Sequence, residues 1–469
     1  MFGLETGMAI VLIFCLIAAC AFEFINGFHD TANAVATVIY THSLKPTVAV
    51  IWSGIFNFIG VMVGGITVAM GIIHLLPVSI LADTSTSHSV AMILAIILSA
   101  IIWNIGTWYF GIPCSSSHTL LGSIFGVGLA FGLLPGVDAV ALNWSKVKDV
   151  GLFLLISPLF GFAVTMALVI LLKKKVKSKK LFAEPPKKKK PPFWIRSILV
   201  LTCTGVSFSH GSNDGQKGVG LIMIILIAFV PFQFALNHNK LPQNLLFEVD
   251  KIESVLSKVD ESKVSAGDKI ALADIKQRVD SMQVILAGSV NFGSMAKDYH
   301  IEIRKDILFL SKEINDILKA QFDSGIKLIP EDKALLKGAV SEIKTYTEYA
   351  PWWVILMISL SLGVGTMVGW KRIVVTIGEK IGKEHLTYAQ GASAELVAAG
   401  TIVLSSNFGL PVSTTHILSS GVAGSMVATN GVKNLRMKTV KNILVAWLVT
   451  IPVTIILSGG IYLLLRAII

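Results

Sequence analysis

Charged residues are scarce in this chain: Asp, Glu, Lys and Arg make up only 15% of its 469 residues, and 53% are hydrophobic. A soluble protein of this length needs more charge on its surface, so the composition disfavours a soluble enzyme or binding protein. Apolar stretches of about 20 residues, enough to cross a hydrocarbon core as a helix, recur instead. They, or near equivalents, cover 8–25, 48–73, 90–110, 150–172, 219–234, 352–370, 389–404 and 443–465. The sequence predicts an all-α, multi-pass protein of the lipid bilayer.

Cysteine is also rare. The four cysteines lie in apolar segments without paired spacing, which indicates neither a disulfide nor a metal site. A His-Glu metal set, a nucleophile–base pair and a phosphate-loop glycine motif are missing as well. We therefore expect no enzymatic activity, no resident metal and no cofactor. The first apolar run has no basic residue before it, which favours a retained span over a signal peptide.

Positive charge is abundant in one place. The net charge is +11, and residues 173–192, KKKVKSKKLFAEPPKKKKPP, hold much of it. Beside a membrane span the positive-inside rule explains this run better than nucleic-acid binding does, so we expect an extended, non-helical cytoplasmic linker and no nucleic-acid partner. Basic loops at 371–385 and 433–441 are expected on the same side. The segment 237–350 and both termini then lie outside, provided that 193–236 crosses only once.

The composition divides the chain into parts. Within 237–350, apolar residues recur three and four apart with charges between them, which predicts amphipathic helices of a small extramembrane bundle. A structural or regulatory insert is the plain interpretation, and a receptor role stays open. The two apolar stripes are Leu245, Val249, Ile252, Leu256, Val259 and Ile303, Ile307, Leu310, Ile314, Ile317. The predicted domains are a first membrane repeat (1–172), the linker (173–192), a second repeat in two parts (193–236 and 351–469) and the insert (237–350).

One phrase occurs twice, as GIPCSSSH at 111–118 and GLPVSTTH at 409–416. Gly and Pro end one helix, and Ser or Thr caps the next. A helix that begins inside the bilayer leaves backbone N–H groups unpaired, and this positive end attracts anions. One such cluster would more often serve packing, but its repetition favours a binding site for a tetrahedral oxyanion. The candidate ligands are Ser115, Ser116, Ser117, Ser413, Thr414 and Thr415.

A second repeated element precedes each hydroxyl motif. GFHDTANA at 27–34 and GSNDGQKG at 211–218 share a Gly and an Asp. Asp30 and Asp214 lie in apolar spans, where a charged residue is a functional candidate by default. The two halves run in opposite directions by the loop charges, which is the inverted-repeat architecture of secondary transporters with broken helices at mid-membrane. Proton carriers or fixed hydrogen-bond partners could be His29, His118, His210 and His416; Glu23 and Glu395 are candidate coupling or gating carboxylates.

Longer stretches carry a family resemblance: NGFHDTANAVATVIYTHSL, FSHGSNDGQKGVGL, WNIGTWYFGIPCSSSHTLLG, LGVGTMVGW with IGEKIGK after it, and TYAQGASAELVAAGTIVLSSNFGLPVSTTH. In these the sequence resembles the PiT family of inorganic phosphate transporters, and within it the bacterial low-affinity Pit proteins. The resemblance covers both membrane repeats and implies a multi-pass protein of the bacterial inner membrane. It implies phosphate contacts at Ser115–Ser117 and Ser413–Thr415, and a coupling-ion region at Asp30, Asn33 and Asp214.

The second half departs from the family pattern Asn-Asp-x-x-Asn of sodium-coupled members. It reads Asn213-Asp214-Gly215-Gln216-Lys217, so an ammonium stands where a neutral amide is expected, and His29 replaces a neutral donor in the first half. Both changes favour proton coupling, with His118 and His416 in supporting roles. The resemblance also implies that phosphate can travel as a complex with Mg or Zn. The expected function is proton–phosphate symport; a sodium-coupled phosphate transporter, a sulfate permease and assembly as a homodimer remain open, and a channel fits less well.

Overall fold

A computed structural model describes residues 2–75, 86–134, 142, 144–186, 189–260, 262, 264, 266–319, 328–369 and 371–468. Every regular element in these ranges is a helix, which confirms the predicted all-α architecture. The chain forms two compact units. The helical unit comprises Met1–Ala9 and Leu226–Tyr349, and the membrane unit comprises Ile10–Ile225 and Ala350–Ile469. The helical unit contains the predicted insert, with 226–236 and the first nine residues added to it.

Five of the described helices are long and apolar enough to cross a bilayer, which supports the predicted multi-pass membrane protein. They are α1 (Thr6–Tyr40), α2 (Pro46–Val63), α5 (Thr86–Tyr109), α7 (Trp144–Lys175) and α18 (Met437–Ile468). A sixth span results if α14 (Trp352–Thr366) and Lys371–Lys380, bent by 55° from each other, are counted together. The helix α8 (Phe193–Phe229) continues without a break through Asp214 and Lys217.

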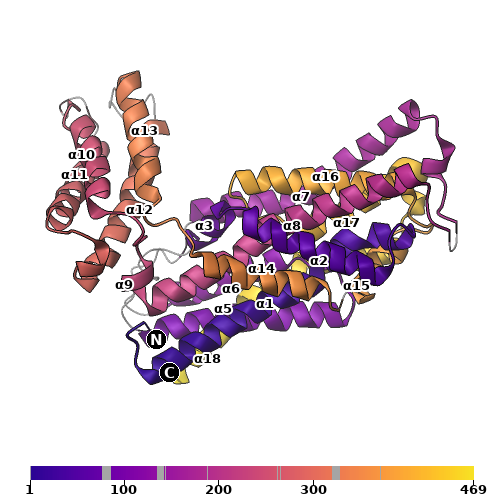
Figure 1. Ribbon diagram of the computed structural model, residues 1–469, viewed down its shortest axis with the longest axis horizontal. Coiled ribbons are helices and arrows are strands. Elements are labelled where there is room, and N and C mark those ends of the chain that lie inside the picture. The colour runs from indigo at the N-terminus through magenta and orange to yellow at the C-terminus, as the bar shows by residue number, and fades with distance from the viewer. Residues whose placement is uncertain are drawn as a thin grey trace. The chain divides into compact units, whose positions relative to one another are not determined.

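The membrane unit repeats one order of helices. The first repeat places α1, α2, α5, α6 and α7 in sequence, and the second places α8, α14, α16, α17 and α18. α6 packs against α18, and α17 packs against α7, so each capped helix lies on the last helix of the other repeat. Figure 1 shows α7, α16 and α17 side by side. The remaining elements of this unit are α3 (Thr67–Ile73), α6 (Ser116–Gly132), η1 (Lys179–Phe182), α15 (Lys371–Val375), η4 (Thr376–Lys380), α16 (Tyr388–Asn407), α17 (Thr414–Asn430) and η5 (Val432–Asn434).

The glycine shared by the two Asp motifs has a packing role. A Cβ on Gly27 would lie 2.5 Å from the backbone oxygen of Leu362 in α14, and one on Gly211 would lie 2.2 Å from that of Asn57 in α2. Real Cβ atoms do not approach backbone so closely, so only glycine permits these helix crossings. Each Asp-bearing helix therefore packs closely on the second helix of the other repeat, and the two contacts are equivalent.

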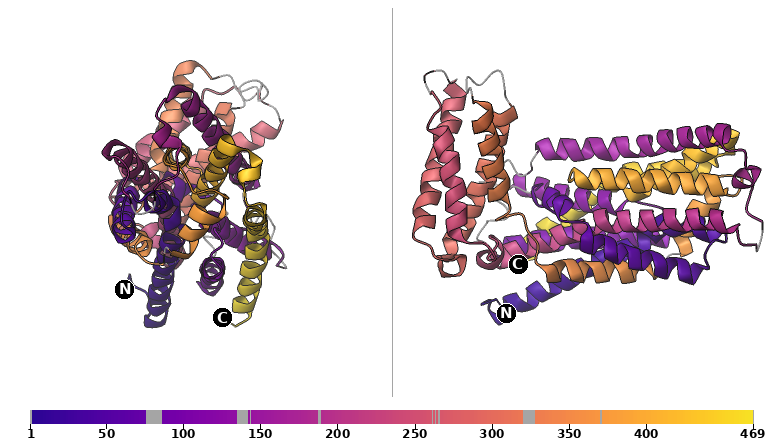
Figure 2. Two further views of the ribbon diagram at one scale, coloured as in Figure 1. Left: turned by 90° about the vertical axis from the view of Figure 1, so that its right-hand side faces the viewer. Right: turned by 45° about the horizontal axis from the view of Figure 1, so that its top comes forward.

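The helical unit is built from four longer helices and short connections. These are α10 (Pro242–Leu256), α11 (Ala266–Ala287), α12 (Lys297–Lys319) and α13 (Pro330–Lys344), with α9 (Pro231–Phe234) and η3 (Phe292–Ser294) beside them. α10 and α12 each pack against both α11 and α13, as Figure 2 shows. Both predicted stripes lie in its core, fully buried except at Val259 and Ile317, which are partly buried. The predicted helical bundle is therefore confirmed.

The linker corrects one prediction. Residues 173–192 were expected to be non-helical, yet α7 continues to Lys175 and Lys179–Phe182 form a 3₁₀ turn. Lysines in a last turn interact favourably with the negative end of the helix, and Lys173 Nζ also donates to the Thr429 carbonyl at 3.0 Å. The described residues from 183 to 192 are non-helical, as the prolines predict.

Candidate functional site

The two hydroxyl motifs begin two helices in the same way. Gly111 and Gly409 precede them with φ of +65° and +66°, in the left-handed region that glycine favours. Ser115 Oγ then accepts from the His118 amide at 3.2 Å, and Ser413 Oγ accepts from the His416 amide at 3.1 Å. The predicted helix break and hydroxyl cap are therefore confirmed in both repeats.

The two helix starts meet in the interior of the membrane unit. The rings of His118 and His416 lie 4.3 Å apart between centroids, and Ser117 Oγ donates to the Val412 carbonyl at 2.8 Å. His416 also stacks on Trp447 at 3.8 Å. All six motif hydroxyls are buried within the protein. The structure thus brings the two candidate anion-binding motifs together and turns neither towards lipid.

Asp30 accepts hydrogen bonds from the opposite repeat. Thr415 Oγ1 donates to Asp30 Oδ1 at 2.8 Å, and Thr414 Oγ1 donates to Asp30 Oδ2 at 3.3 Å. Asn33 Nδ2 donates to the same Thr415 hydroxyl at 3.0 Å, and His29 Nδ1 lies 3.0 Å from Asp30 Oδ1. The first Asp motif is therefore linked directly to the second hydroxyl motif.

Asp214 has a permanent counter-charge instead. Lys217 Nζ lies 2.7 Å from Asp214 Oδ1 and donates to Ser117 Oγ of the first hydroxyl motif. It also donates to the Val412 carbonyl at 3.3 Å. Lys217 is 2% exposed, and an ammonium is this deeply buried only when it is paired. The Lys217 ammonium thus supplies the Asp214 carboxylate with a counter-charge from the protein itself.

His210 lies between the two aspartates. Its Nε2 is 3.6 Å from Asp30 Oδ2 and 3.7 Å from Asp214 Oδ2, so it connects the two repeats. The ligand atoms of these three residues lie within 4.8 Å of one another, a spacing that could hold a metal ion. The ammonium of Lys217, 2.7 Å from Asp214, would repel a divalent ion at this position.

Three predicted residues lie beside this cluster without joining the aspartates. Glu395 Oε2 accepts from Thr202 Oγ1 at 2.5 Å, and Glu23 Oε2 accepts from Asn26 Nδ2 at 3.1 Å. Asn213 Nδ2 donates to Ser406 Oγ at 2.9 Å. Asn213 therefore braces the end of α16, next to the turn before the second hydroxyl motif. All three side chains are fully buried.

Sequence reasoning missed Asn57 and Thr366, which orient the site. Asn57 Oδ1 lies 2.8 Å from His210 Nδ1, and Asn57 Nδ2 donates to Thr366 Oγ1 at 3.1 Å. Asn57 is one of the few amides in an apolar span, and a polar residue at such a depth is a functional candidate. That rule could have identified Asn57. Its contact with Thr366, 309 residues further along the chain, could not be inferred from the sequence.

The arrangement offers donors to an anion. The caps occupy the amides of His118 and His416, whereas the first-turn amides before them have no partner within their helices. Among the described residues, Ser116 Oγ is a buried hydroxyl without a hydrogen-bond partner. Helix starts, hydroxyls and one ammonium can together bind an oxyanion, provided that the aspartates are neutralised.

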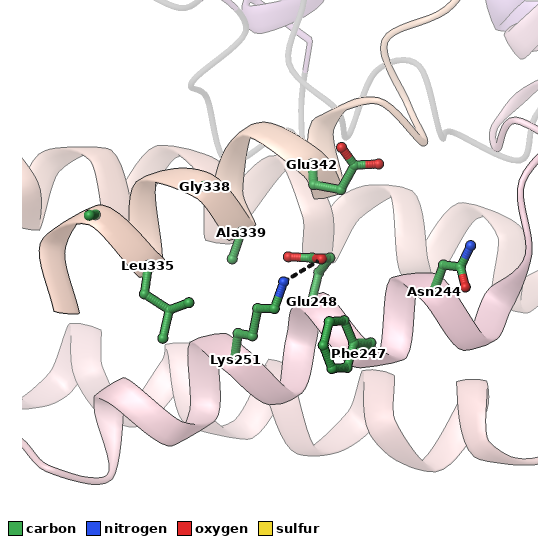
Figure 3. A pocket seen from close by; sticks show the side chains of 9 residues that line it. Asn244, Phe247, Glu248, Lys251, Leu335, Gly338, Ala339 and Glu342 are labelled. Carbon is green, nitrogen blue, oxygen red and sulfur yellow. Dashed lines mark hydrogen bonds and ion pairs between the residues drawn. The ribbon is translucent and has the colours of Figure 1, made fainter. Parts of the chain in front are cut away.

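A surface groove on the helical unit is a different kind of feature. It has a volume of about 510 Å³ and lies between α10 and α13. Figure 3 shows Lys251 paired with Glu248 along its wall, at 2.7 Å, beside Phe247 and Leu335. The Lys251 ammonium is thus already neutralised, and the groove contains none of the predicted site residues.

Comparisons with known proteins agree with the geometry. The model of the phosphate transporter family matches residues 26–458. The low-affinity inorganic phosphate transporter PitA of Escherichia coli K12 is 41% identical over 98% of this chain and 97% of its own length. A probable low-affinity inorganic phosphate transporter of Bacillus subtilis is 27% identical over 98% of this chain and 99% of its own.

One solved structure is similar in fold. It is described as the sodium-dependent phosphate transporter, and it superposes with a TM-score of 0.55 at 18% identity. The match covers 98% of this chain and 100% of that one. This likeness supports the arrangement of helices and carries nothing about the coupling ion.

Proposed function

The chain belongs to the phosphate transporter family, and we propose that it imports inorganic phosphate by proton symport across the bacterial inner membrane. The relatives that carry the name of phosphate transporters match it over nearly the whole length of both chains. The repeated, reciprocally packed helices are the architecture in which secondary transporters alternate access to a central site.

One observation carries the choice of an anion as substrate. Two capped helix starts, at Ser115 and Ser413, converge within the membrane unit, with the free hydroxyl of Ser116 beside them. Helix N-termini bind phosphate through free amides and the helix dipole. Hydroxyl and amide donors hold an oxyanion less tightly than arginines would, which suits a substrate that must be released on the other side.

Proton coupling is supported by the charges around the anion site. Asp30 and Asp214 would repel a phosphate dianion, since charges interact strongly in a poorly hydrated interior. Lys217 lies 2.7 Å from Asp214 and balances its charge, so Asp30 is the carboxylate left for a mobile cation to balance. His29 and His210 lie beside Asp30, and histidine is the side chain type whose charge can change near neutral pH. A sodium ion would have to bind next to the ammonium of Lys217, which is unfavourable.

The transport cycle needs no covalent step. A proton from outside neutralises the aspartate pair, phosphate binds between the two helix starts, and the loaded centre changes its access. Release of proton and phosphate on the inside resets the empty, charged centre. We extend the proposal to phosphate that carries a divalent metal such as Mg or Zn, because a neutral metal–phosphate complex would lower the charge of the cargo.

Uptake of labelled phosphate by the full chain in proteoliposomes tests this proposal, with the proton gradient, sodium and magnesium varied independently. We expect accumulation when the outside is more acidic, and no change when choline replaces sodium. A strict requirement for sodium would contradict proton symport and favour a sodium-coupled transporter. Competition by sulfate as strong as that by unlabelled phosphate would contradict selectivity for phosphate. Uptake that does not depend on magnesium would contradict the proposal that a metal–phosphate complex is transported.

A further inference from the structure

We infer that His210 carries the coupling proton, on its Nε2 atom, and thereby joins the charge states of the two repeats. This inference rests on the proposed function and makes it specific, since several histidines lie near the aspartates. The geometry singles out His210 because it is within ion-pair distance of both Asp30 and Asp214, at 3.6 and 3.7 Å.

The tautomer of His210 follows from a chain of hydrogen bonds. Thr366 Oγ1 donates to the Leu362 carbonyl at 2.8 Å, so it accepts from Asn57 Nδ2. The carbonyl oxygen of the Asn57 amide then faces His210 Nδ1 at 2.8 Å and can only accept. Nδ1 of His210 must therefore carry a hydrogen, and Nε2 is the ring atom left to titrate.

In the neutral ring this Nε2 has a lone pair directed at two carboxylates. Nε2 of His210 and Oδ2 of Asp214 are both buried without a hydrogen-bond partner among the described residues. A buried polar atom without a partner costs free energy. One proton on Nε2 would give both carboxylates a charged neighbour. The cluster as it stands therefore lacks one hydrogen, and Nε2 is the atom that can receive it.

Among the described residues, the charged and titratable groups nearest His210 come from two helices. On α1 these are Asp30 and His29, and on α8 they are Asp214 and Lys217. Glu23 of α1 also lies close, against Gly218 of α8, with its carboxyl hydrogen-bonded to Asn26. The groups from α2 and α17 that reach this cluster are the uncharged Asn57, Thr414 and Thr415. When the histidines and the Glu23 carboxyl are neutral, two carboxylates and one ammonium leave a net charge of −1. A proton on His210 makes this set neutral, which is the state that admits an anion.

The other histidines of the site do not lie between two carboxylates, although Nε2 of His416 is also buried without a hydrogen-bond partner among the described residues. His29 can donate from Nδ1 to Asp30 at 3.0 Å while Nε2 contacts Thr107 Oγ1 at 3.3 Å. His118 Nδ1 contacts Ser115 Oγ at 2.9 Å, and His416 is stacked on Trp447. Among the ion pairs of the described residues, none involves His118 or His416. A proton on either ring would therefore lack a direct carboxylate partner.

Net accumulation and exchange of phosphate by the His210→Gln variant in proteoliposomes test the inference. Wild type should accumulate phosphate when the outside is acidic, and its apparent affinity should fall about tenfold per pH unit above the titration range, as one required proton dictates. H210Q leaves the set one charge short of neutral at every pH, so its phosphate binding and exchange should be weak and should change less than about twofold with pH. His29→Gln should retain the pH dependence at a changed rate, and the exposed His385→Gln should match wild type.

A second variant and a binding measurement distinguish loss of the proton carrier from misfolding of the variant. Asn57→Leu leaves His210 in place but removes the acceptor at Nδ1, so its pH profile should shift along the pH axis and not disappear. Phosphate binding by purified protein in two buffers of different ionisation enthalpy counts the protons taken up. We expect about one per phosphate in wild type, as for one titrating group, and none in H210Q.

The outcomes separate the two proposals. Acid-stimulated accumulation that survives in H210Q, or unchanged proton uptake on phosphate binding, overturns the role of His210 and leaves phosphate transport standing. A wild-type protein that moves no phosphate under any gradient overturns the proposed function itself. Loss of the pH dependence in H29Q but not in H210Q would transfer the role to His29.

Discussion

The two repeats of the membrane unit hold the same contact with different charges. In the first, Asn33 reaches Thr415 of the opposite hydroxyl motif with a neutral amide. In the second, the residue three positions after the aspartate is Lys217, and it reaches Ser117, the equivalent hydroxyl. The geometry is thus repeated while the electrostatics are not.

The two aspartates therefore have different partners for their negative charge. Asp214 is paired with a fixed ammonium at 2.7 Å, so its charge is balanced in every step of a cycle. Asp30 is hydrogen-bonded to Thr414 and Thr415 and lies beside His29 and His210, and histidine is the side chain that changes charge near neutral pH. The charge balance around Asp30 is therefore the one that can change, through His210 of the second repeat, and variants that alter the partners of each aspartate should show it.

Lys217→Asn, which gives the second motif the pattern of the first, should have the largest effect. Removing one member of a buried ion pair costs about 3–5 kcal/mol, because the other charge stays buried without a partner. We expect a marked loss of thermal stability in detergent and no phosphate uptake. The double variant Asp214→Asn/Lys217→Asn should recover most of the stability; a single variant as stable as wild type would contradict the pairing.

Asp30→Asn should come next, because it removes the carboxylate charge that a proton on His210 would balance while keeping the shape of the side chain. The amide oxygen can still accept from Thr415, so the fold should remain intact. Coupling free energies of about 1–3 kcal/mol correspond to roughly 5–150-fold, and we expect the upper end, about 100-fold less proton-driven uptake. Circular dichroism and thermal unfolding serve as controls. Uptake within twofold of wild type would show that the two aspartates do not differ as described.

Short-range patterns in the sequence predicted the capped helix starts of the two repeats and the apolar stripes of the helical unit. The capped helix starts at Ser115 and Ser413 could be predicted because a turn glycine, a proline and a hydroxyl act within a few residues of one another. The stripes of the helical unit could be predicted because helical periodicity is also local. The helical end of α7 at Lys175 differs from the predicted linker, because lysines are also favourable in the last turn of a helix.

The orientation of the site could not be predicted in the same way. His210 was one of four candidate histidines, and nothing near it in the sequence distinguishes it. What distinguishes it is Asn57 from α2 and Asp30 from α1, contacts that only the packing of the two repeats creates. Likewise, the sequence suggested Lys217 as a charge near Asp214 but not its hydrogen bond to Ser117.

Ser116→Ala and Thr414→Ala compare equivalent positions of the two hydroxyl motifs. Ser116 Oγ has no partner among the described residues, whereas Thr414 Oγ1 donates to Asp30 at 3.3 Å. A hydrogen bond to a charged group contributes about 1.5–3 kcal/mol, so S116A should weaken phosphate binding about tenfold or more without changing the pH dependence. T414A should weaken binding and shift the pH profile as well. Titration of purified protein with phosphate at several pH values measures both, and unaltered affinity in both variants would remove these hydroxyls from the site.

The smallest effect is expected outside the repeats, where two histidines of the helical unit lie 5.3 Å apart between ring centroids. Burial lowers the pKa of His300, and the neighbouring His238 lowers it further; burial also lowers the pKa of His238. The folded unit therefore binds protons more weakly than the unfolded chain, whose histidines titrate near about 6.5. Its stability is fully present above that pH and is lost as the pH falls below it. Hydrogen exchange of the full chain should show less protection of 226–349 at pH of about 5.5 than at about 7.5. His300→Phe, which keeps an aromatic ring beside Phe292, should reduce this dependence, and a variant that loses protection as steeply as wild type would place the sensitivity elsewhere.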